Sequence, residues 1–418
     1  GEPAPDAAVS DITPQFHYHN PANAKPCPSP CTESPMMPAR SLFLFAFTAL
    51  LGCVAPAADG PPPTAALREA PAGSDQPGEQ TPVVVKTLVD GLKDPWGMDF
   101  LPDGSLLLTE LGGELKHIDG ETLQATAIGN VPASAKAGQG GLMDVLVHPN
   151  FERNRLVYLS YTVSEGGKYS TRVSRGRLEG SALTGVETLF TAQPFFRERR
   201  HFGSRLLLDD GYLFITVGDR GNRDLAQSLT THNGKVIRLT EDGAVPGDNP
   251  FVDEDGALPE IWTYGHRNPQ GMARHPFNGQ IWVAEHGPRG GDEVNALTPG
   301  TNYGWPVITY GEEYSGGKIG VGTHAEGMEQ PLVYWVPSIG AGNIDFYTGD
   351  LYPGWTDSLL VAGLKLTRIS RLELEGDALG NETRLLANLG MRVRDLQVGP
   401  DGMVYALAGG SRLIRLQP

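Results

Sequence analysis

The chain has 418 residues, with 33 basic and 49 acidic side chains and a formal charge of −16. Its 54 glycines and 34 prolines argue against a helical bundle or coiled coil, whereas a 39% share of hydrophobic residues is enough for a real core. The acidic balance argues against a nucleic-acid binder with a wide basic face.

The beginning of the chain lacks the pattern of a fold. Residues 1–35 are rich in proline, alanine and asparagine, and Met36 and Met37 are the first methionines. We therefore expect residues 1–35 to be an upstream stretch that is not part of the protein in the cell. Arg40 and a short apolar run over residues 41–51 follow, which is the pattern of a secretory signal and is too short to span a bilayer.

The signal ends in Leu50-Leu51-Gly52-Cys53, which resembles the bacterial lipobox, in which the cysteine is lipidated and becomes the first residue. This predicts a lipoprotein signal peptide over 36–52 and an exported, periplasmic protein that is anchored to the outer membrane through Cys53. An ordinary signal peptide, cut near Ala55 or Ala57, is the alternative.

The other two cysteines, Cys27 and Cys31, would be removed with the leader. The mature domain would then have no disulfide and no thiolate metal site. Cys27 and Cys31 could form half a zinc site, but the sequence offers no partner pair. Residues 53–81 are rich in proline, alanine, glycine and serine and are predicted to be a flexible tether, so the folded domain would span 82–418.

One theme repeats through this domain: a turn with proline, aspartate or glycine precedes an apolar run of strand-forming residues. The six turns are centred on Pro102, Pro149, Asp210, Pro276, Pro353 and Pro400. A hairpin that recurs in this way without helices between the copies is typical of a six-bladed β-propeller with four-stranded antiparallel blades. An array of β-sandwiches is the alternative, and it would not explain the recurring turn. We expect the strand at 83–88 to close the ring beside the last blade.

Glycine-rich and basic segments gather in the predicted loops, and most lie beside a repeat hairpin of a different blade. They are Gly138-Gln-Gly-Gly-Leu, His201-Phe-Gly-Ser-Arg, Gly265-His-Arg-Asn-Pro-Gln-Gly, Glu285-His-Gly-Pro-Arg-Gly-Gly-Asp-Glu, and Lys365 with Arg392-Val-Arg394. A propeller would bring such loops together at the mouth of its channel. A local positive patch on an acidic protein indicates a compact polyanion as ligand.

These motifs together resemble the soluble quinoprotein aldose (glucose/sorbosone) dehydrogenases, which are six-bladed propellers that use pyrroloquinoline quinone (PQQ). The resemblance covers about Leu92 to Leu416, and it depends on the combination of His201-x-Gly-x-Arg, Arg267-Asn268 and the segment that begins at Glu285. Ser204 stands where the glucose-specific branch has a second glycine, so the resemblance is closer to the broader aldose-sugar branch.

The resemblance implies a set of residues around PQQ. Lys365, Arg392 and Arg394 would face its three carboxylates and its ring. By themselves, Arg392 and Arg394 could equally form a solvated strand face. The other implied cofactor contacts are Gln139, Arg267, Asn268 and Tyr314.

The resemblance also implies the catalytic roles. His201 matches the general base for the anomeric hydroxyl, and Asp219 matches the carboxylate that holds its tautomer. Arg267 would stabilise the negative charge that develops beside the quinone oxygen. His148 and His275 lie in repeat turns and are assigned no chemistry, and the role of His286 stays open.

Two calcium sites are implied as well. The backbone carbonyls of Gly287 and Pro288 match the ligands of a Ca²⁺ that also binds the quinone. Glu293 and Tyr303 match a second, structural site. Asp292 could contribute there, and without the resemblance it is only a turn acid.

The implied function is oxidation of aldose sugars at C1 to aldonolactones, with PQQ and Ca²⁺ as cofactors and an external electron acceptor. We expect a monomer or homodimer. Two other classes stay open: a propeller that only binds a sugar or a partner, and a calcium-dependent lactonase. The lactonase would need a cluster of Asn, Asp and Glu at the channel axis, and the sequence shows only Asp292 and Glu293.

Overall fold

The computed structural model describes Arg68–Glu69 and residues 83–418. The predicted upstream stretch, the signal peptide, Cys53 and most of the tether lie outside the described residues and stay predictions. Among the described residues, no helix has both the length and the apolar character that a membrane span needs.

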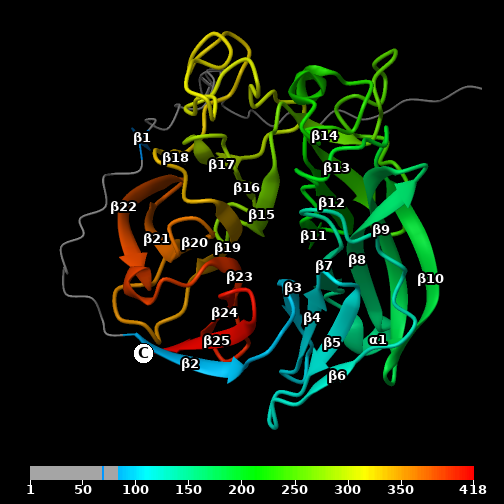
Figure 1. Cartoon of the computed structure of the whole chain (residues 1–418), viewed down its shortest axis with the longest axis vertical. Helices are drawn as coiled ribbons and strands as arrows, with labels where there is room; N and C mark the ends of the chain where they lie inside the picture. The colour runs from blue at the N-terminus through cyan, green and yellow to red at the C-terminus, as the bar shows by residue number, and fades with distance from the viewer. Residues whose placement is uncertain (1–67, 70–82) are drawn as a thin grey trace, which may run out of the picture. The chain divides into compact units, whose positions relative to one another are not determined.

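Six antiparallel sheets account for the domain, as predicted (Figure 1). Five consist of strands that follow one another in the chain: β3–β6 (Pro95–Phe100, Leu106–Glu110, Glu114–Ile118, Ala125–Ala127), β7–β10 (Leu142–Val147, Leu156–Glu165, Lys168–Glu179, Ala182–Thr191), β11–β14 (Leu206–Asp209, Tyr212–Val217, Lys235–Thr240, Ile261–Tyr264), β15–β18 (Pro269–Arg274, Ile281–Glu285, Asp292–Ala296, Val333–Trp335) and β19–β22 (Ala341–Tyr347, Ser358–Gly363, Arg368–Glu375, Ala378–Leu385). Helical segments are short: α1 (Phe151–Asn154) and the 3-10 turns η1 (Arg223–Gln227) and η2 (Ala387–Leu389).

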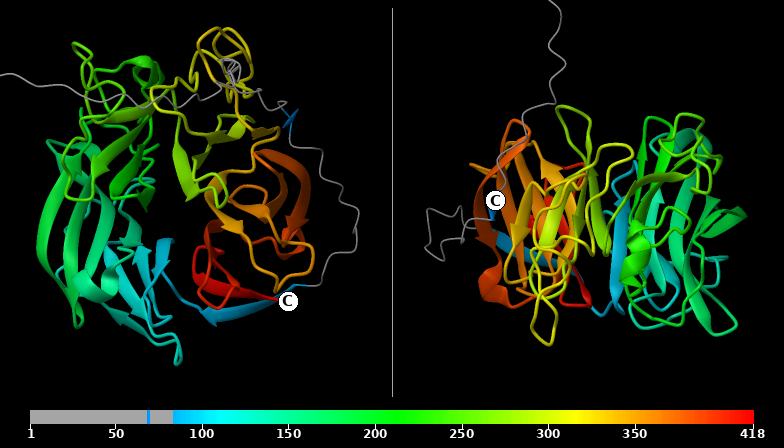
Figure 2. Two further views of the ribbon diagram at one scale, coloured as in Figure 1. Left: turned by 180° about the vertical axis from the view of Figure 1, so that it is seen from behind. Right: turned by 90° about the horizontal axis from the view of Figure 1, so that it is seen from above.

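The sixth sheet closes the ring by joining the two ends of the domain. It contains β23 (Val393–Val398), β24 (Val404–Ala408), β25 (Arg412–Gln417) and β2 (Val84–Val89), and β2 pairs antiparallel with β25. This confirms the predicted closing strand. The first strand of every sheet contacts the first strands of both neighbours, so β3, β7, β11, β15, β19 and β23 form the inner ring (Figures 1 and 2). Within the predicted tether, β1 (Arg68–Glu69) pairs parallel with β18.

The six repeat turns of the sequence all have one structural place. Each connects the first strand of a sheet to the second: Pro102 follows β3, Pro149 follows β7, Asp210 follows β11, Pro276 follows β15, Pro353 follows β19 and Pro400 follows β23. The strands of a sheet alternate in direction, so these turns lie at one end of every sheet. The segments that enter each first strand, and those that join the second strand to the third, lie at the other end, which is the mouth.

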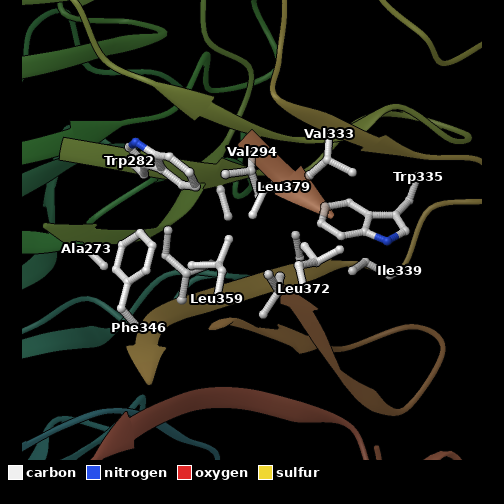
Figure 3. Close-up of a cluster of buried hydrophobic side chains, with 14 residues drawn as sticks. Ala273, Trp282, Val294, Val333, Trp335, Ile339, Phe346, Leu359, Leu372 and Leu379 are labelled. Carbon is white, nitrogen blue, oxygen red and sulfur yellow. The ribbon is translucent and has the colours of Figure 1, made fainter. Parts of the chain in front are cut away.

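Side chains between neighbouring sheets form the core. In the cluster drawn in Figure 3, Trp282 of β16 meets Phe346 of β19 edge to face at 5.3 Å between ring centroids, and Leu359 and Leu372 are fully buried beside them. Every sheet of the ring has a neighbouring sheet on both faces. Successive strand residues point to opposite faces, so both kinds of position are buried and the strands show continuous apolar runs.

Aspartates on the first strands, of which Asp144 and Asp395 are fully buried and Asp99 and Asp345 half-buried, link neighbouring sheets along the inner ring. Four backbone amides each donate to an aspartate of the preceding sheet: Val147 to Asp99 at 2.6 Å, Leu206 to Asp144 at 2.8 Å, Val398 to Asp345 at 2.8 Å, and Met98 to Asp395 at 2.9 Å. A buried carboxylate that accepts such bonds fixes the register between two sheets that share no ladder hydrogen bonds.

Arg205 supplies positive charge to this ring. Its guanidinium donates to Asp144 at 2.8 Å and to the carbonyl of Gln270 at 2.9 Å, and it lies 3.5 Å from Asp395. It also lies over the ring of Trp96. The arginine of the His201-x-Gly-x-Arg motif therefore holds the inner strands together.

The buried aspartates make stability depend on pH. Burial, with a smaller contribution from Asp144 and Asp395, raises the pKa of Asp99 to about 7. The folded state thus holds this proton more tightly than the unfolded chain, so the contribution of Asp99 is full in acid and is lost as pH rises towards 7. We expect the stability of Asp99→Asn relative to wild type to rise by about 2–3 kcal/mol between pH 5 and pH 8.

Urea unfolding at the two pH values measures this difference. Asp255→Asn, at an exposed position between β13 and β14, is the control and should keep the wild-type pH dependence. Parallel pH profiles for wild type and both variants would contradict the assignment.

Candidate active site

Loops from all six sheets meet around one cavity of about 590 Å³ at the mouth. Ten of the predicted site residues line it: Gln139, His201, Arg267, Asn268, Gly287, Pro288, Tyr314, Lys365, Arg392 and Arg394. The predicted convergence of the loops is therefore confirmed. Asp219 lies behind His201, and Glu293 and Tyr303 are not among the lining residues.

His201 and Asp219 form a hydrogen-bonded pair. His201 Nδ1 lies 2.7 Å from Asp219 Oδ1, and the backbone amide of His201 donates to Gln139 Oε1 at 2.8 Å. The backbone of His201 has a φ of 54°, a conformation that is strained for a residue with a side chain. With Nδ1 directed at the carboxylate, Nε2 is the ring nitrogen left to accept a proton from a ligand.

The electrostatics of this pair favour a neutral imidazole. Burial lowers the pKa of His201, and Arg267 and Arg200 lower it further, while the hydrogen bond and charge of Asp219 oppose the shift. Burial would raise the pKa of Asp219, but its hydrogen bond to His201 and the charges nearby bring it below the ordinary value. An ionised aspartate beside a neutral histidine is the arrangement that a general base needs.

Arg267 joins the His201–Asp219 pair to the opposite wall of the cavity. Its backbone carbonyl accepts the amide of Asp219 at 2.8 Å, while its Nη1 donates to the carbonyls of His286 at 3.0 Å and Gly287 at 2.8 Å. Two buried nitrogens of the lining, Arg267 Nε and His286 Nε2, have no hydrogen-bond partner among the described residues. Burial and the arginines nearby lower the pKa of His286 well below its usual value, so it is a neutral lining group.

A cluster of cations occupies the other side of the mouth. Arg394 is partly buried and donates to Gln270 Oε1 at 2.7 Å, and burial together with Arg392 and Arg205 lowers its pKa to about 10. Arg392 and Lys365 are exposed at the rim. Three cations that repel one another in one cavity favour an anionic ligand.

Sequence reasoning missed several lining residues, including Trp96 and the ion pair of Lys136 with Asp94 at 3.2 Å, and it gave no role to Gln270 of the segment that begins at Gly265. Trp96 and Gln270 belong to first strands, β3 and β15, and the other two precede first strands. The signal that could have found them was their position at the start of a blade, since this places a residue at the mouth whatever its type.

Asp292 has a supporting role that its sequence context did not show. Its oxygens accept hydrogen bonds from the amides of Gly287 (2.8 Å), Gly340 (2.5 Å) and Ala341 (3.0 Å) and from the hydroxyl of Ser338 (2.7 Å). Burial raises its pKa. Asp292 thus ties two lining loops together with both of its carboxylate oxygens.

Glu293 lies on β17, and Tyr303 lies in the segment that connects β17 to β18. Burial, and repulsion from Glu285 on the neighbouring strand, raise the pKa of Glu293 well above its usual value. The Tyr303 hydroxyl is engaged by the backbone of Ala296 and Thr298. Among the described residues, no group of three or more His, Cys, Asp or Glu side chains could hold a metal ion.

Tyr314 stands at the rim with 71% of its surface exposed. Ion pairs hold the two preceding residues: Glu312 lies 3.3 Å from Arg289, and Glu313 lies 2.6 Å from Arg223. The loop that carries Tyr314 is thus fixed from both sides.

The fold and site define a class: a six-bladed propeller whose mouth combines a hydrogen-bonded histidine–aspartate pair with a cationic pocket. Residues 92–415 match the profile of the glucose/sorbosone dehydrogenase family, and the chain belongs to that family. The aldose sugar dehydrogenase YliI of Escherichia coli is 42% identical over 80% of this chain and 93% of its own length.

Solved structures agree with this assignment. The apo form of the soluble aldose sugar dehydrogenase from Escherichia coli matches 81% of this chain and all of its own, with a TM-score of 0.79 and 42% identity. The PQQ-bound aldose sugar dehydrogenase from Streptomyces coelicolor matches 80% of this chain and 98% of its own, with a TM-score of 0.67 and 27% identity.

Removing the charge of Asp219 tests the electrostatics of the pair. Asp219→Asn should lower the pKa of His201 further, because the carboxylate raises it and would no longer oppose burial and Arg267. An NMR titration of protein labelled with ¹⁵N-histidine measures this pKa directly. Asp224→Asn, in the exposed part of η1, is the control, and an unchanged His201 pKa in Asp219→Asn would contradict the pairing.

Proposed function

We propose that the protein is a PQQ- and calcium-dependent aldose sugar dehydrogenase that oxidises the anomeric C1 hydroxyl of aldoses to aldonolactones. One observation carries the proposal: a single cavity unites the His201–Asp219 pair with Lys365, Arg392 and Arg394. Names of relatives point the same way, since two are called aldose sugar dehydrogenases and one solved structure contains PQQ.

The lining residues fit PQQ. A cavity of about 590 Å³ is in the range that holds small cofactors. Lys365, Arg392 and Arg394 would face the carboxylates, because arginine pairs carboxylates bidentately and lysine adds a point charge. The unpartnered Arg267 Nε and His286 Nε2 are buried polar atoms that a bound ligand could satisfy. Gln139, Asn268 and Tyr314 complete the proposed contacts.

Calcium fits the carbonyls of Gly287 and Pro288, since this ion takes backbone oxygens as ligands. The Gly287 carbonyl already accepts Arg267 Nη1, so the ion and the guanidinium would share it. The second proposed ion, at Glu293 and Tyr303, would offset the crowding of Glu293 and Glu285. Backbone carbonyls would have to complete that coordination.

The protein's own residues would carry the proton transfer. The aldose would lie over the mouth, where Nε2 of neutral His201 takes the proton of the C1 hydroxyl while Asp219 stabilises the imidazolium that forms. Arg267, held by the carbonyls of His286 and Gly287, would stabilise the negative charge that develops beside the quinone oxygen. Bound PQQ would supply the two-electron acceptor, with Ca²⁺ as a Lewis acid on it.

We also propose that the protein is exported, is lipid-anchored through Cys53 in the periplasm, and passes electrons to an external acceptor as a monomer or homodimer. The support for export and anchoring is the leader sequence. Mass spectrometry of the mature N-terminus would show diacylglyceryl on Cys53, whereas a start near Ala55 or Ala57 would contradict the anchor.

Reconstitution tests the activity. We expect the purified protein, loaded with PQQ and Ca²⁺, to reduce a dye with several aldoses, and His201→Ala to lower kcat by roughly a hundredfold or more. His117→Ala, in β5 and away from the mouth, is the matched control and should keep wild-type activity. No dye reduction by the loaded wild type, or equal activity in both variants, would refute the proposal.

Binding of the cofactor has its own test. Arg394→Gln should weaken PQQ binding about tenfold or more, because the variant loses a charge-assisted contact in a partly buried site. An ultraviolet–visible titration of the apo protein with PQQ measures the Kd. Arg415→Gln on β25 of the same sheet is the control, and equal Kd values would argue against the assigned carboxylate site.

A further inference from the structure

We propose that Trp305 is a positioning residue of the active site, which holds the Asp219 carboxylate in place and through it sets the proton affinity of His201. This inference rests on the proposed function only for its kinetic consequence. Trp305 is not among the residues that line the cavity, so it would act through Asp219 and not on the substrate.

The indole of Trp305 provides a hydrogen-bond donor for the second oxygen of the Asp219 carboxylate. Trp305 Nε1 donates to Asp219 Oδ2 at 2.8 Å. The other oxygen, Oδ1, accepts the backbone amide of Gly221 at 2.6 Å and faces His201 Nδ1 at 2.7 Å. Each oxygen thus has a fixed donor from a different direction. The carboxylate cannot rotate about its Cβ–Cγ bond without losing the hydrogen bonds from Trp305 and Gly221. Oδ1, which faces His201 Nδ1, therefore stays in one place.

Trp305 is itself fixed by two segments of the neighbouring β11–β14 sheet, the one that follows β14 and η1. Its backbone amide donates to the carbonyl of Gly265 at 2.8 Å, and its carbonyl accepts Gln227 Nε2 at 2.8 Å. Gln227 also exchanges hydrogen bonds with the side chain of Asn302. Ala226 packs against the indole in a small buried cluster. A side chain with this many restraints can hold a hydrogen-bond geometry for another residue.

The ring also contacts two cations of the mouth. The guanidinium carbon of Arg267 lies 5.3 Å from the ring centroid and that of Arg223 lies 5.8 Å from it, both within the range of cation–π attraction. Arg267 lines the cavity, and Arg223 pairs with Glu313 beside Tyr314. Trp305 therefore supports the base, the arginine of the opposite wall and the rim loop at the same time.

Removing the indole N–H should change the pKa of His201 in a definite direction. In Trp305→Phe the ring is kept, but Oδ2 loses its donor, so the carboxylate becomes a stronger acceptor for the imidazolium of His201. The pKa of His201 should rise by roughly half a unit to one unit, opposite to the fall expected for Asp219→Asn. The charged and titratable groups around the pair are Arg200, Arg220, Arg223, Arg267 and His286, and the substitution keeps all of them.

The experiment compares two tryptophan variants. Trp282→Phe is the matched control, since Trp282 is fully buried and its Nε1 has no hydrogen-bond partner in the described part of the chain. NMR titration of ¹⁵N-histidine-labelled protein without cofactor should show the raised His201 pKa in Trp305→Phe and the wild-type value in Trp282→Phe. Equal His201 pKa values in the two variants would overturn the proposal.

Kinetics of the reconstituted enzyme give a second readout. Trp305→Phe should lower kcat about tenfold with little change in KM, and the acid limb of its pH profile should move to higher pH. Adding Trp305→Phe to Asp219→Asn should cause no further loss, because the carboxylate through which the indole acts is gone. A full additional loss in that background would overturn the proposal. If the loaded wild type oxidises no aldose, the proposed function fails, while the titration without cofactor still decides the role of Trp305.

Discussion

The hydrogen bonds between inner-strand aspartates and the amides of the next sheet are the constraint on which the rest of the molecule depends. The six sheets are separate ladders, so their relative register depends on contacts between a strand and the side chains of the next sheet. Asp99, Asp144, Asp345 and Asp395 provide such contacts at four of the six junctions of the ring. The mouth segments that enter these first strands end on them, so fixing the strands also fixes where those segments meet.

This constraint sets the electrostatics of the cavity. Buried carboxylates lie on the strands that carry the cavity floor, and Arg205 satisfies two of them beneath Trp96. The charge of Asp395 favours the charged form of Arg394, whereas burial, Arg392 and Arg205 oppose it. An acidic protein thus presents a positive pocket, because its negative charge lies on other surfaces and beneath the floor.

The sequence allowed the fold and ten of the residues that line the cavity to be predicted, because a short local pattern marks each of them. The recurring turn indicated the blades, and short motifs such as His201-x-Gly-x-Arg marked the residues that reach the cavity. The supporting residues were not predictable in this way. Trp305 meets Asp219 across 86 positions, and Asp292 meets Gly340 across 48, so no local pattern records either contact. Only the closed ring brings these segments together.

Arg267 connects the two sides of the site, the His201–Asp219 pair and the loop that carries Gly287. Its carbonyl holds the amide of Asp219, its guanidinium holds the carbonyl of Gly287, and its charge acts on His201. The charge of Arg267 thus lowers the pKa of His201, while its guanidinium holds the loop that carries Gly287. The two walls of the cavity, which different segments of the ring supply, are therefore connected through one side chain.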